Sequence, residues 1–247
     1  MPTDRKPLIG VPGGEVEIIL RGSAVPEVRR DFLLERINAI IATNWRSTRP
    51  HWSREHSPFH DDYGMAFFHK DSKIIGYFIY KRLTLDGIPV FYGAGTAVLS
   101  SYQGEGCYQM MHRHALDAEW RAMSPEVSEI YFAWRTRNLA IWISCSRACK
   151  MVTPSLWDGR EDPKLQDACL RLAREIYPDC PIEPPAMIMR NAFDHLTDIR
   201  RPKRRSTRPI SARFSEVLAN PADAIFSVGI VERSTWSASM KLSRLRK

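Results

Sequence analysis

A glycine-containing turn between a strand pattern and a helix pattern is the feature that most restricts how this chain can fold. Residues 97–103 (AVLSSYQ) end a strand pattern, and Gly104, Glu105 and Gly106 form the turn. Apolar residues at helical spacing follow, on one face of a helix that begins at Cys107. A strand that leads directly into an amphipathic helix predicts a sheet with that helix packed against it.

The same turn has the chemistry of an anion site. The first amides of a helix have no intrahelical partner, and the helix dipole favours negative charge beside them. Glycines allow a phosphate to approach the backbone closely. The main-chain N–H groups that we expect to hold a pyrophosphate belong to Gly104, Glu105, Gly106, Cys107 and Tyr108. The alternative is an ordinary strand-to-helix connection, and the segment is too short for a Walker A loop.

Hydrophobic periodicity places further elements on both sides of this turn. Strands and helices alternate only in the middle of the chain, which predicts an α/β fold of the α+β type with a mixed sheet. Helices are expected at residues 26–45, 107–122, 138–149 and 164–177, and strands at 16–20, 65–69, 74–80, 89–99, 130–135, 185–190 and 224–231.

Two segments resemble the GNAT superfamily of acyl-CoA N-acyltransferases. In GTAVLSSYQGEGCYQMM, residues 103–106 occupy the first four positions of the family's acyl-CoA-binding motif, while Tyr108 stands where the motif has Gly or Ala. In EIYFAWRTRNLAIWISCSRACKMV, Asn138 and Ala140 match the helix that follows the family's fifth strand. The resemblance covers about residues 60–155.

The resemblance implies a mostly antiparallel central sheet flanked by helices and splayed between the fourth and fifth strands. It implies acetyl-CoA or another acyl-CoA as co-substrate, and no metal. Its pantetheine would pair with Val98 and Leu99, its diphosphate would lie on residues 103–108 (Gln103 to Tyr108), and Asn138 would belong to the same site. An amine would attack the thioester directly.

The catalytic groups are less conventional for this family. The fourth-strand segment PVFYGAGTAVL contains no carboxylate that could act as a general base. Where many members have a tyrosine that protonates the departing thiolate, this chain has Ser144 and Cys145. A hydroxyl or thiol there could hydrogen-bond the CoA sulfur, and the alternative is that both side chains only pack against the fold.

A histidine-rich stretch precedes the second strand of this core. His51, His56 and His60 lie close to Asp61 and Asp62, but Pro50 and Pro58 interrupt the helix that a shared metal would need. We therefore expect a loop beside the acceptor site, in which His56, His60 or Asp62 binds or deprotonates an amine. The alternative is a solvated loop.

The basic excess lies at one end of the chain. Lys and Arg number 36 against 28 Asp and Glu, for a net charge of +8, and residues 197–247 alone hold 12 basic and 4 acidic side chains. Residues 1–196 are therefore neutral, which argues against a nucleic-acid binder. We expect an acyltransferase domain over residues 1–196 and a basic extension, residues 197–247, that adds a last strand to it.

Residues 200–208 (RRPKRRSTR) concentrate this charge. The expected roles are a contact to the 3′-phosphate of CoA, to an acidic acyl carrier protein, to nucleic acid, or only to water.

Five cysteines without a CxxC pair and a start without a leader pattern predict reduced thiols and a cytoplasmic protein. No apolar run is long enough for a membrane span. His114, Trp120, Trp134 and Trp142 are expected in the core.

Three functions are compatible with these patterns. The first is transfer of an acetyl group from acetyl-CoA to a primary amine of a small molecule. The second is an N-acyl amino acid synthase-like enzyme whose donor is an acyl carrier protein. The third is a catalytically inactive GNAT-like binding module. Homodimerisation is left open.

Overall fold

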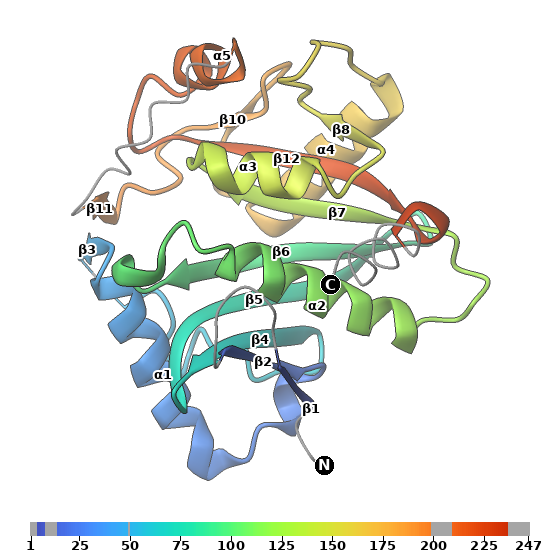
Figure 1. Ribbon diagram of the computed structural model, residues 1–247. Helices are drawn as coiled ribbons and strands as arrows, with labels where there is room; N and C mark the ends of the chain where they lie inside the picture. The colour runs from blue at the N-terminus through green and yellow to red at the C-terminus, as the bar shows by residue number, and fades with distance from the viewer. Residues whose placement is uncertain (1–3, 8–13, 49, 199–208, 237–247) are drawn as a thin grey trace. The chain divides into compact units, whose positions relative to one another are not determined.

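The computed structural model describes residues 4–7, 14–48, 50–198 and 209–236, and Figure 1 labels its elements. The helices are α1 (Glu27–Ala42), α2 (Cys107–Ala122), α3 (Leu139–Ser146), α4 (Pro163–Ile176) and α5 (Pro209–Val217), with 3-10 turns η1 (Gly22–Ala24) and η2 (Ser100–Tyr102). The strands are β1 (Asp4–Pro7), β2 (Gly14–Ile19), β3 (Trp45–Ser47), β4 (Tyr63–Lys70), β5 (Lys73–Leu85), β6 (Ile88–Val98), β7 (Glu129–Thr136), β8 (Met151–Thr153), β9 (Ile182–Glu183), β10 (Ile188–Met189), β11 (Leu196–Asp198) and β12 (Ala224–Glu232).

The chain forms two compact units, and each is described by itself. The first comprises residues 1–82, 93–123 and 195–201, and the second comprises residues 83–92, 124–194 and 202–247. Strands β5 and β6 contribute to both. The boundary expected between residues 196 and 197, where the acyltransferase domain would end and the basic extension begin, remains a prediction.

In the first unit, the strand order is β1-β2-β4-β5-β6, and β3 pairs separately with β11. The pairs β1–β2, β2–β4 and β4–β5 are antiparallel. Alternation along β5 separates two faces: Tyr77 and Ile79 join the hydrophobic cluster of α1, whereas Phe78 packs against Tyr108 of α2. Helices α1 and α2 therefore cover opposite faces of this sheet.

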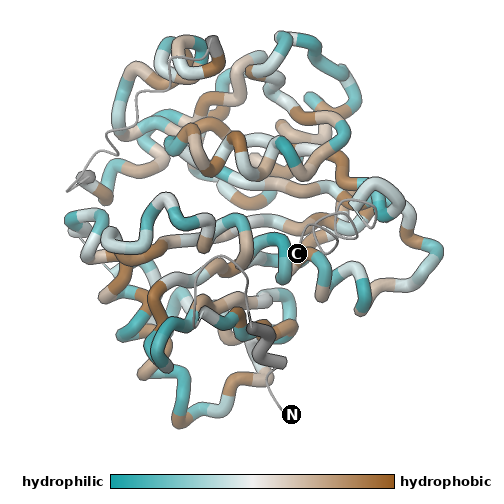
Figure 2. The backbone as a smooth tube through the Cα atoms, viewed as in Figure 1, coloured by the Kyte–Doolittle hydropathy of each residue, from teal (hydrophilic) through white to brown (hydrophobic). Residues whose placement is uncertain are grey.

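Helix α1 buries one face in its second half, where apolar residues recur at helical spacing. Leu33, Ile37 and Ile40 are fully buried against β4 and β5, and teal and brown segments alternate along the helix in Figure 2. Val28 and Phe32 are exceptions, since both are apolar and exposed. The helix ends at Ala42, earlier than expected, and β3 begins at Trp45.

In the second unit, the strand order is β6-β7-β12-β10-β9, and β8 also pairs with β12. The pairs of β12 with β7, β8 and β10 are antiparallel. On one face of β12, Ser227 accepts a hydrogen bond from Trp142 of α3 at 3.1 Å. On the other face, Phe226 packs against Tyr92 and Tyr177. The last strand expected from the C-terminal region is thus β12, inside the sheet.

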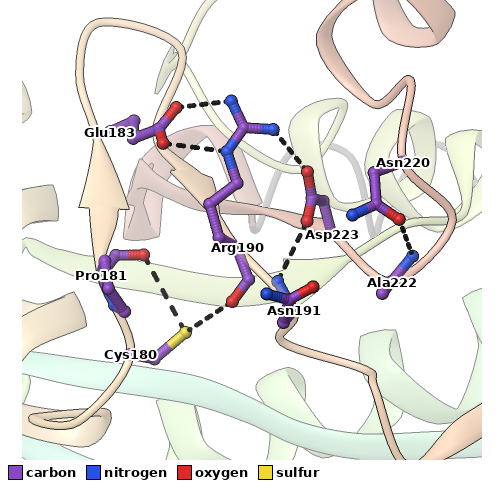
Figure 3. A network of polar contacts seen from close by, with 8 residues as sticks. All are labelled: Cys180, Pro181, Glu183, Arg190, Asn191, Asn220, Ala222 and Asp223. Carbon is purple, nitrogen blue, oxygen red and sulfur yellow. Dashed lines mark hydrogen bonds and ion pairs between the residues drawn. The ribbon is translucent and has the colours of Figure 1, made fainter.

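A polar network ties the β9–β10 hairpin to the start of β12 (Figure 3). Arg190 pairs with Glu183 and with the fully buried carboxylate of Asp223, which also accepts a hydrogen bond from the Asn191 N–H at 3.0 Å. The two carboxylates raise the pKa of Arg190. This network explains how a segment of two-residue strands keeps its shape.

Two sequence predictions are wrong in detail. The expected strand at residues 185–190 is a turn followed by the two-residue β10, because Met187 has a φ of 54°, outside the extended region. On α2, the fully buried histidine is His112 and not His114, which is half-buried. Trp120, Trp134 and Trp142 are buried, as predicted.

The fold class is confirmed: a mostly antiparallel sheet is flanked by helices in an α/β chain. The splay between the fourth and fifth strands, here β6 and β7, stays a prediction. Within the described residues, no helix combines the length and the apolar character that crossing a membrane requires.

Candidate functional site

The glycines of the turn are required by backbone conformation. Gly104 has a φ of 89° and Gly106, the N-cap of α2, has a φ of 81°. A Cβ would meet nothing within 4 Å at Gly104 and only the Gln109 side chain, at 3.9 Å, at Gly106. Open space therefore surrounds both α-carbons, and the left-handed conformation is what selects glycine. Both properties suit a backbone that a ligand approaches closely.

Tyr108, which stands where the family motif has Gly or Ala, turns its side chain away from the turn. Its side chain is buried, with the ring centroid 6.0 Å from that of Phe78 and 4.9 Å from that of His112. The ring packs on the sheet because position 108 lies on the buried face of α2. His112 is enclosed beside it, and burial lowers its pKa to about 4, so its imidazole is neutral at pH 7.

Cys107 begins α2 but is not a reactive thiolate. Its side chain is buried, and burial together with the charge of Glu105 raises the pKa of the thiol to about 11. A helix N-terminus normally lowers a thiol pKa. Here burial prevails, and the main-chain role expected for Cys107 remains a prediction. Glu105 is exposed and adds one negative charge to the turn.

Lys70 supplies the opposite charge, and sequence reasoning missed it. It ends β4, 35 positions before Glu105, and its Nζ lies 5.1 Å from the centroid of the Tyr102 ring in η2. Tyr102 lies two residues before Gly104, so the ammonium lies beside the segment that leads into the turn. Lys70 is one basic residue in a predicted hairpin, and nothing in the sequence around it indicated that it lies beside the turn.

Asn44 is a second residue that the sequence did not reveal. Its Nδ2 donates to the carbonyl of Val98 at 3.0 Å and to that of Ile40 at 3.1 Å, while its Oδ1 accepts from Gln103. The same amide thus terminates α1, holds the end of β6 and orients the first residue of the motif.

The main-chain groups predicted to pair with pantetheine already have partners in the first unit. The Val98 carbonyl accepts from Asn44, the Leu99 N–H donates to the Ile75 carbonyl at 2.8 Å, and the Leu99 carbonyl accepts from the Tyr102 N–H at 2.9 Å. A carbonyl oxygen has two lone pairs, so the Leu99 carbonyl can accept one more hydrogen bond, whereas the Val98 carbonyl also accepts from Gln103 Nε2 at 3.5 Å.

The remaining motif residues lie on α3, in the second unit. Asn138 is the N-cap of α3, and its Oδ1 accepts from the Ala140 N–H at 2.9 Å. Ser144 is half-buried, whereas Cys145 is fully buried. Of the two, Ser144 has the accessible side chain that contact with a thioester would require.

The histidine-rich stretch forms a loop between β3 and β4. Trp52 anchors it by entering the α1 core, and His56 stacks on that indole with centroids 5.3 Å apart. Asp62 pairs with Lys81 at 3.4 Å, and His60 is exposed.

In the part of the chain that the structure describes, no group of three or more His, Cys, Asp or Glu is arranged to hold a metal. The predicted basic segment, residues 200–208, lies outside the described residues.

No protein-family model and no curated protein matches this chain. Solved structures do show similarity. One is the ribosomal-protein-S18-alanine N-acetyltransferase of Escherichia coli, with 19% identity, a TM-score of 0.39, and coverage of 60% of this chain and 88% of that one. Naa50 of Arabidopsis thaliana, in complex with a bisubstrate analogue of CoA, has 10% identity, a TM-score of 0.42, and coverage of 86% and 97%.

A third is an aminoglycoside acetyltransferase from an uncultured soil metagenomic sample, with 13% identity, a TM-score of 0.37, and coverage of 70% of this chain and 93% of that one. The first and the third of these are acetyltransferases by name. Because these identities and TM-scores are low, the function proposed below rests on the residues and motifs of this chain.

Proposed function

We propose that this chain is an acyl-CoA-dependent N-acyltransferase of the GNAT superfamily, which transfers an acetyl group from acetyl-CoA to a primary amine. The observation that carries the proposal is the turn before α2. Two glycines hold left-handed backbone there and present the N-terminus of a 16-residue helix. That arrangement suits a pyrophosphate.

The charges around the turn support an anionic ligand. Lys70 adds a cation over Tyr102, just before the turn, and no acidic residue lies in the first turn of the helix. Glu105 is the only opposing charge in the turn itself. The helix terminus and Lys70 together favour a bound diphosphate.

The proposed reaction needs few protein groups. The amine nitrogen attacks the thioester carbonyl carbon, the C–S bond breaks, and the amine loses one proton while the thiolate gains one. Ser144 is the candidate for a hydrogen bond to the departing sulfur, with Cys145 as the buried second candidate. His56, His60 and Asp62 are the candidates for binding the amine. The turn provides binding and positioning, which account for much of the rate in such a transfer.

Calorimetric titration with acetyl-CoA tests the proposal. We expect saturable binding with a Kd below about 1 mM, and mass spectrometry should detect acetylation in a panel of primary amines. The absence of saturable heat at that concentration would exclude the proposal.

A matched pair of charge variants tests whether the turn is the site. Lys70→Gln should weaken acetyl-CoA binding, and Glu105→Gln should strengthen it, each by about two- to fivefold at low salt. Lys164→Gln, an exposed lysine on α4, serves as the control and should change nothing. Equal affinities for all four proteins would mean that the diphosphate binds elsewhere.

The carrier-protein alternative predicts a different result. Neutralising Arg204 and Arg205 should then lower turnover with a carrier-bound donor and leave turnover with acetyl-CoA unchanged. An inactive binding module would bind acetyl-CoA or a partner without acetylating any amine.

A further inference from the structure

A pocket in the first unit lies on the α1 side of the sheet, away from the turn. Its volume is about 520 Å³, and α1 and the β4–β5 hairpin form its walls. Basic and aromatic side chains dominate the lining, namely Arg29, Phe32, Arg36, His69 and Lys73. None of these residues has a role in the function proposed above.

One arginine of this pocket is paired with a carboxylate, and the other is not. Arg29 forms a bidentate ion pair with the fully buried Glu17: Nη1 lies 2.7 Å from Oε1, and Nη2 lies 2.9 Å from Oε2. Arg36 instead donates from Nε and Nη2 to the carbonyl of Ile74, at 2.8 and 2.6 Å. A carbonyl fixes the guanidinium plane but leaves its charge uncompensated. Among the described residues, no carboxylate lies within ion-pair distance of Arg36 or Lys73.

His69 adds a buried polar atom that lacks a partner. Its Nε2 lies 2.8 Å from Glu17 Oε2, and since a carboxylate only accepts, Nε2 carries the proton. Its Nδ1 is buried without a hydrogen-bond partner among the described residues, and the side chain is only 6% exposed. Such atoms are rare in folded proteins, and a ligand is one way to satisfy them.

Phe32 provides an apolar wall. It lies one helical turn before Arg36 on α1, and 57% of its surface is exposed although the ring is large and apolar. An exposed ring beside an uncompensated guanidinium and an ammonium suits a ligand with both an apolar body and a negative charge.

We propose that this pocket binds a small organic anion, with a phosphate or carboxylate group between Arg36 and Lys73 and an apolar body against Phe32. Glu17 holds Arg29 and His69 in place beneath it. The site is separate from the diphosphate turn, because His69 lies on the α1 side of the sheet, whereas the following residue, Lys70, has its ammonium over Tyr102 beside α2.

Calorimetric titration of the full chain with phenyl phosphate tests this inference, with inorganic phosphate as a second probe. We expect saturable binding of phenyl phosphate with a Kd of about 1 mM or below. Inorganic phosphate should bind several-fold more weakly, because it lacks the aromatic body. In a ¹H–¹⁵N experiment on the histidine side chains, the Nδ1 resonance of His69 should shift with the same saturation curve.

Variants separate the two parts of the site. The double variant Arg36→Gln, Lys73→Gln should weaken phenyl phosphate binding at least about tenfold. Phe32→Ala should remove the preference for phenyl phosphate over inorganic phosphate. Lys164→Gln, on α4 of the second unit, is the control and should bind as the unmodified protein does. Thermal melts check that each variant is folded.

The outcomes are distinct from those of the acetyl-CoA experiment. Phenyl phosphate binding without acetyl-CoA binding would support this site and exclude the proposed acyltransferase. No saturable phenyl phosphate binding, or equal binding by the double variant, would overturn the inference and leave the acyltransferase proposal intact.

Discussion

The ion pair beneath the α1-side pocket allows a quantitative prediction about acid stability. Glu17 is fully buried on β2, between Arg29 and His69. Burial by itself raises the pKa of this carboxyl, but the hydrogen bonds from His69 and Arg29 outweigh it and hold the pKa at about 2. The difference from the ordinary pKa of 4.5 corresponds to about 3 kcal/mol of folding stability, since a pKa difference of one is worth about 1.4 kcal/mol.

The sign of the pH dependence follows from the lowered pKa. The contribution is fully present above pH 4.5, where the unfolded carboxyl is also ionised, and it is lost as the pH falls toward about 2. Glu17→Gln should therefore lower the free energy of unfolding by about 3 kcal/mol at pH 7. Below pH 4.5 the difference in unfolding free energy between the variant and the unmodified protein should narrow by about 1.4 kcal/mol per pH unit.

Urea denaturation followed by tryptophan fluorescence, from pH 7 to pH 3, measures this gap. Glu35→Gln is the matched control, because Glu35 is an exposed carboxylate on the helix that carries Arg29. A gap for Glu17→Gln that stays constant down to pH 3 would refute the electrostatic reasoning and assign the loss to packing. An equal loss for Glu35→Gln would refute it as well.

Three further outcomes are expected. Gly106→Ala should cost about 1 kcal/mol of unfolding free energy in urea, because a Cβ disfavours its φ of 81°, and it should weaken acetyl-CoA binding in calorimetry. Tyr80→Phe should cost about 1–3 kcal/mol in the same assay, because the buried phenol donates to Glu119 at 2.6 Å; a neutral effect would contradict the burial of that pair. Cys107, whose thiol pKa is about 11, should resist alkylation by iodoacetamide at pH 8 until urea unfolds the chain, as mass spectrometry of the labelled peptide would show.

Local periodicity was enough to locate most elements. Helix α2 begins and ends where the sequence predicts, at Cys107 and Ala122, because its apolar face, its glycine N-cap and its length are all local properties. The strands β4, β6, β7 and β12 were found within one or two residues for the same reason. The glycine turn could be predicted because left-handed backbone and the residue type that tolerates it are adjacent in the chain.

The partners of the turn could not be predicted in this way. Lys70 and Asn44 reach it through strand pairing and helix packing over 35 and 59 positions, measured to Glu105 and Gln103. Nothing in their local sequence distinguishes them from other polar residues. The side-chain direction of Tyr108 was also undetermined, because only the packed sheet shows that position 108 faces Phe78.

The sequence by itself therefore determined most of the elements, the fold class and the backbone of the candidate anion site, which all depend on neighbours within a few residues. Tertiary structure alone decided which charges surround that site, which histidine of α2 is buried, and that Arg36, Lys73 and His69 line one pocket. Charge and burial at a point are sums over residues far apart in the chain, and only folding brings those residues together.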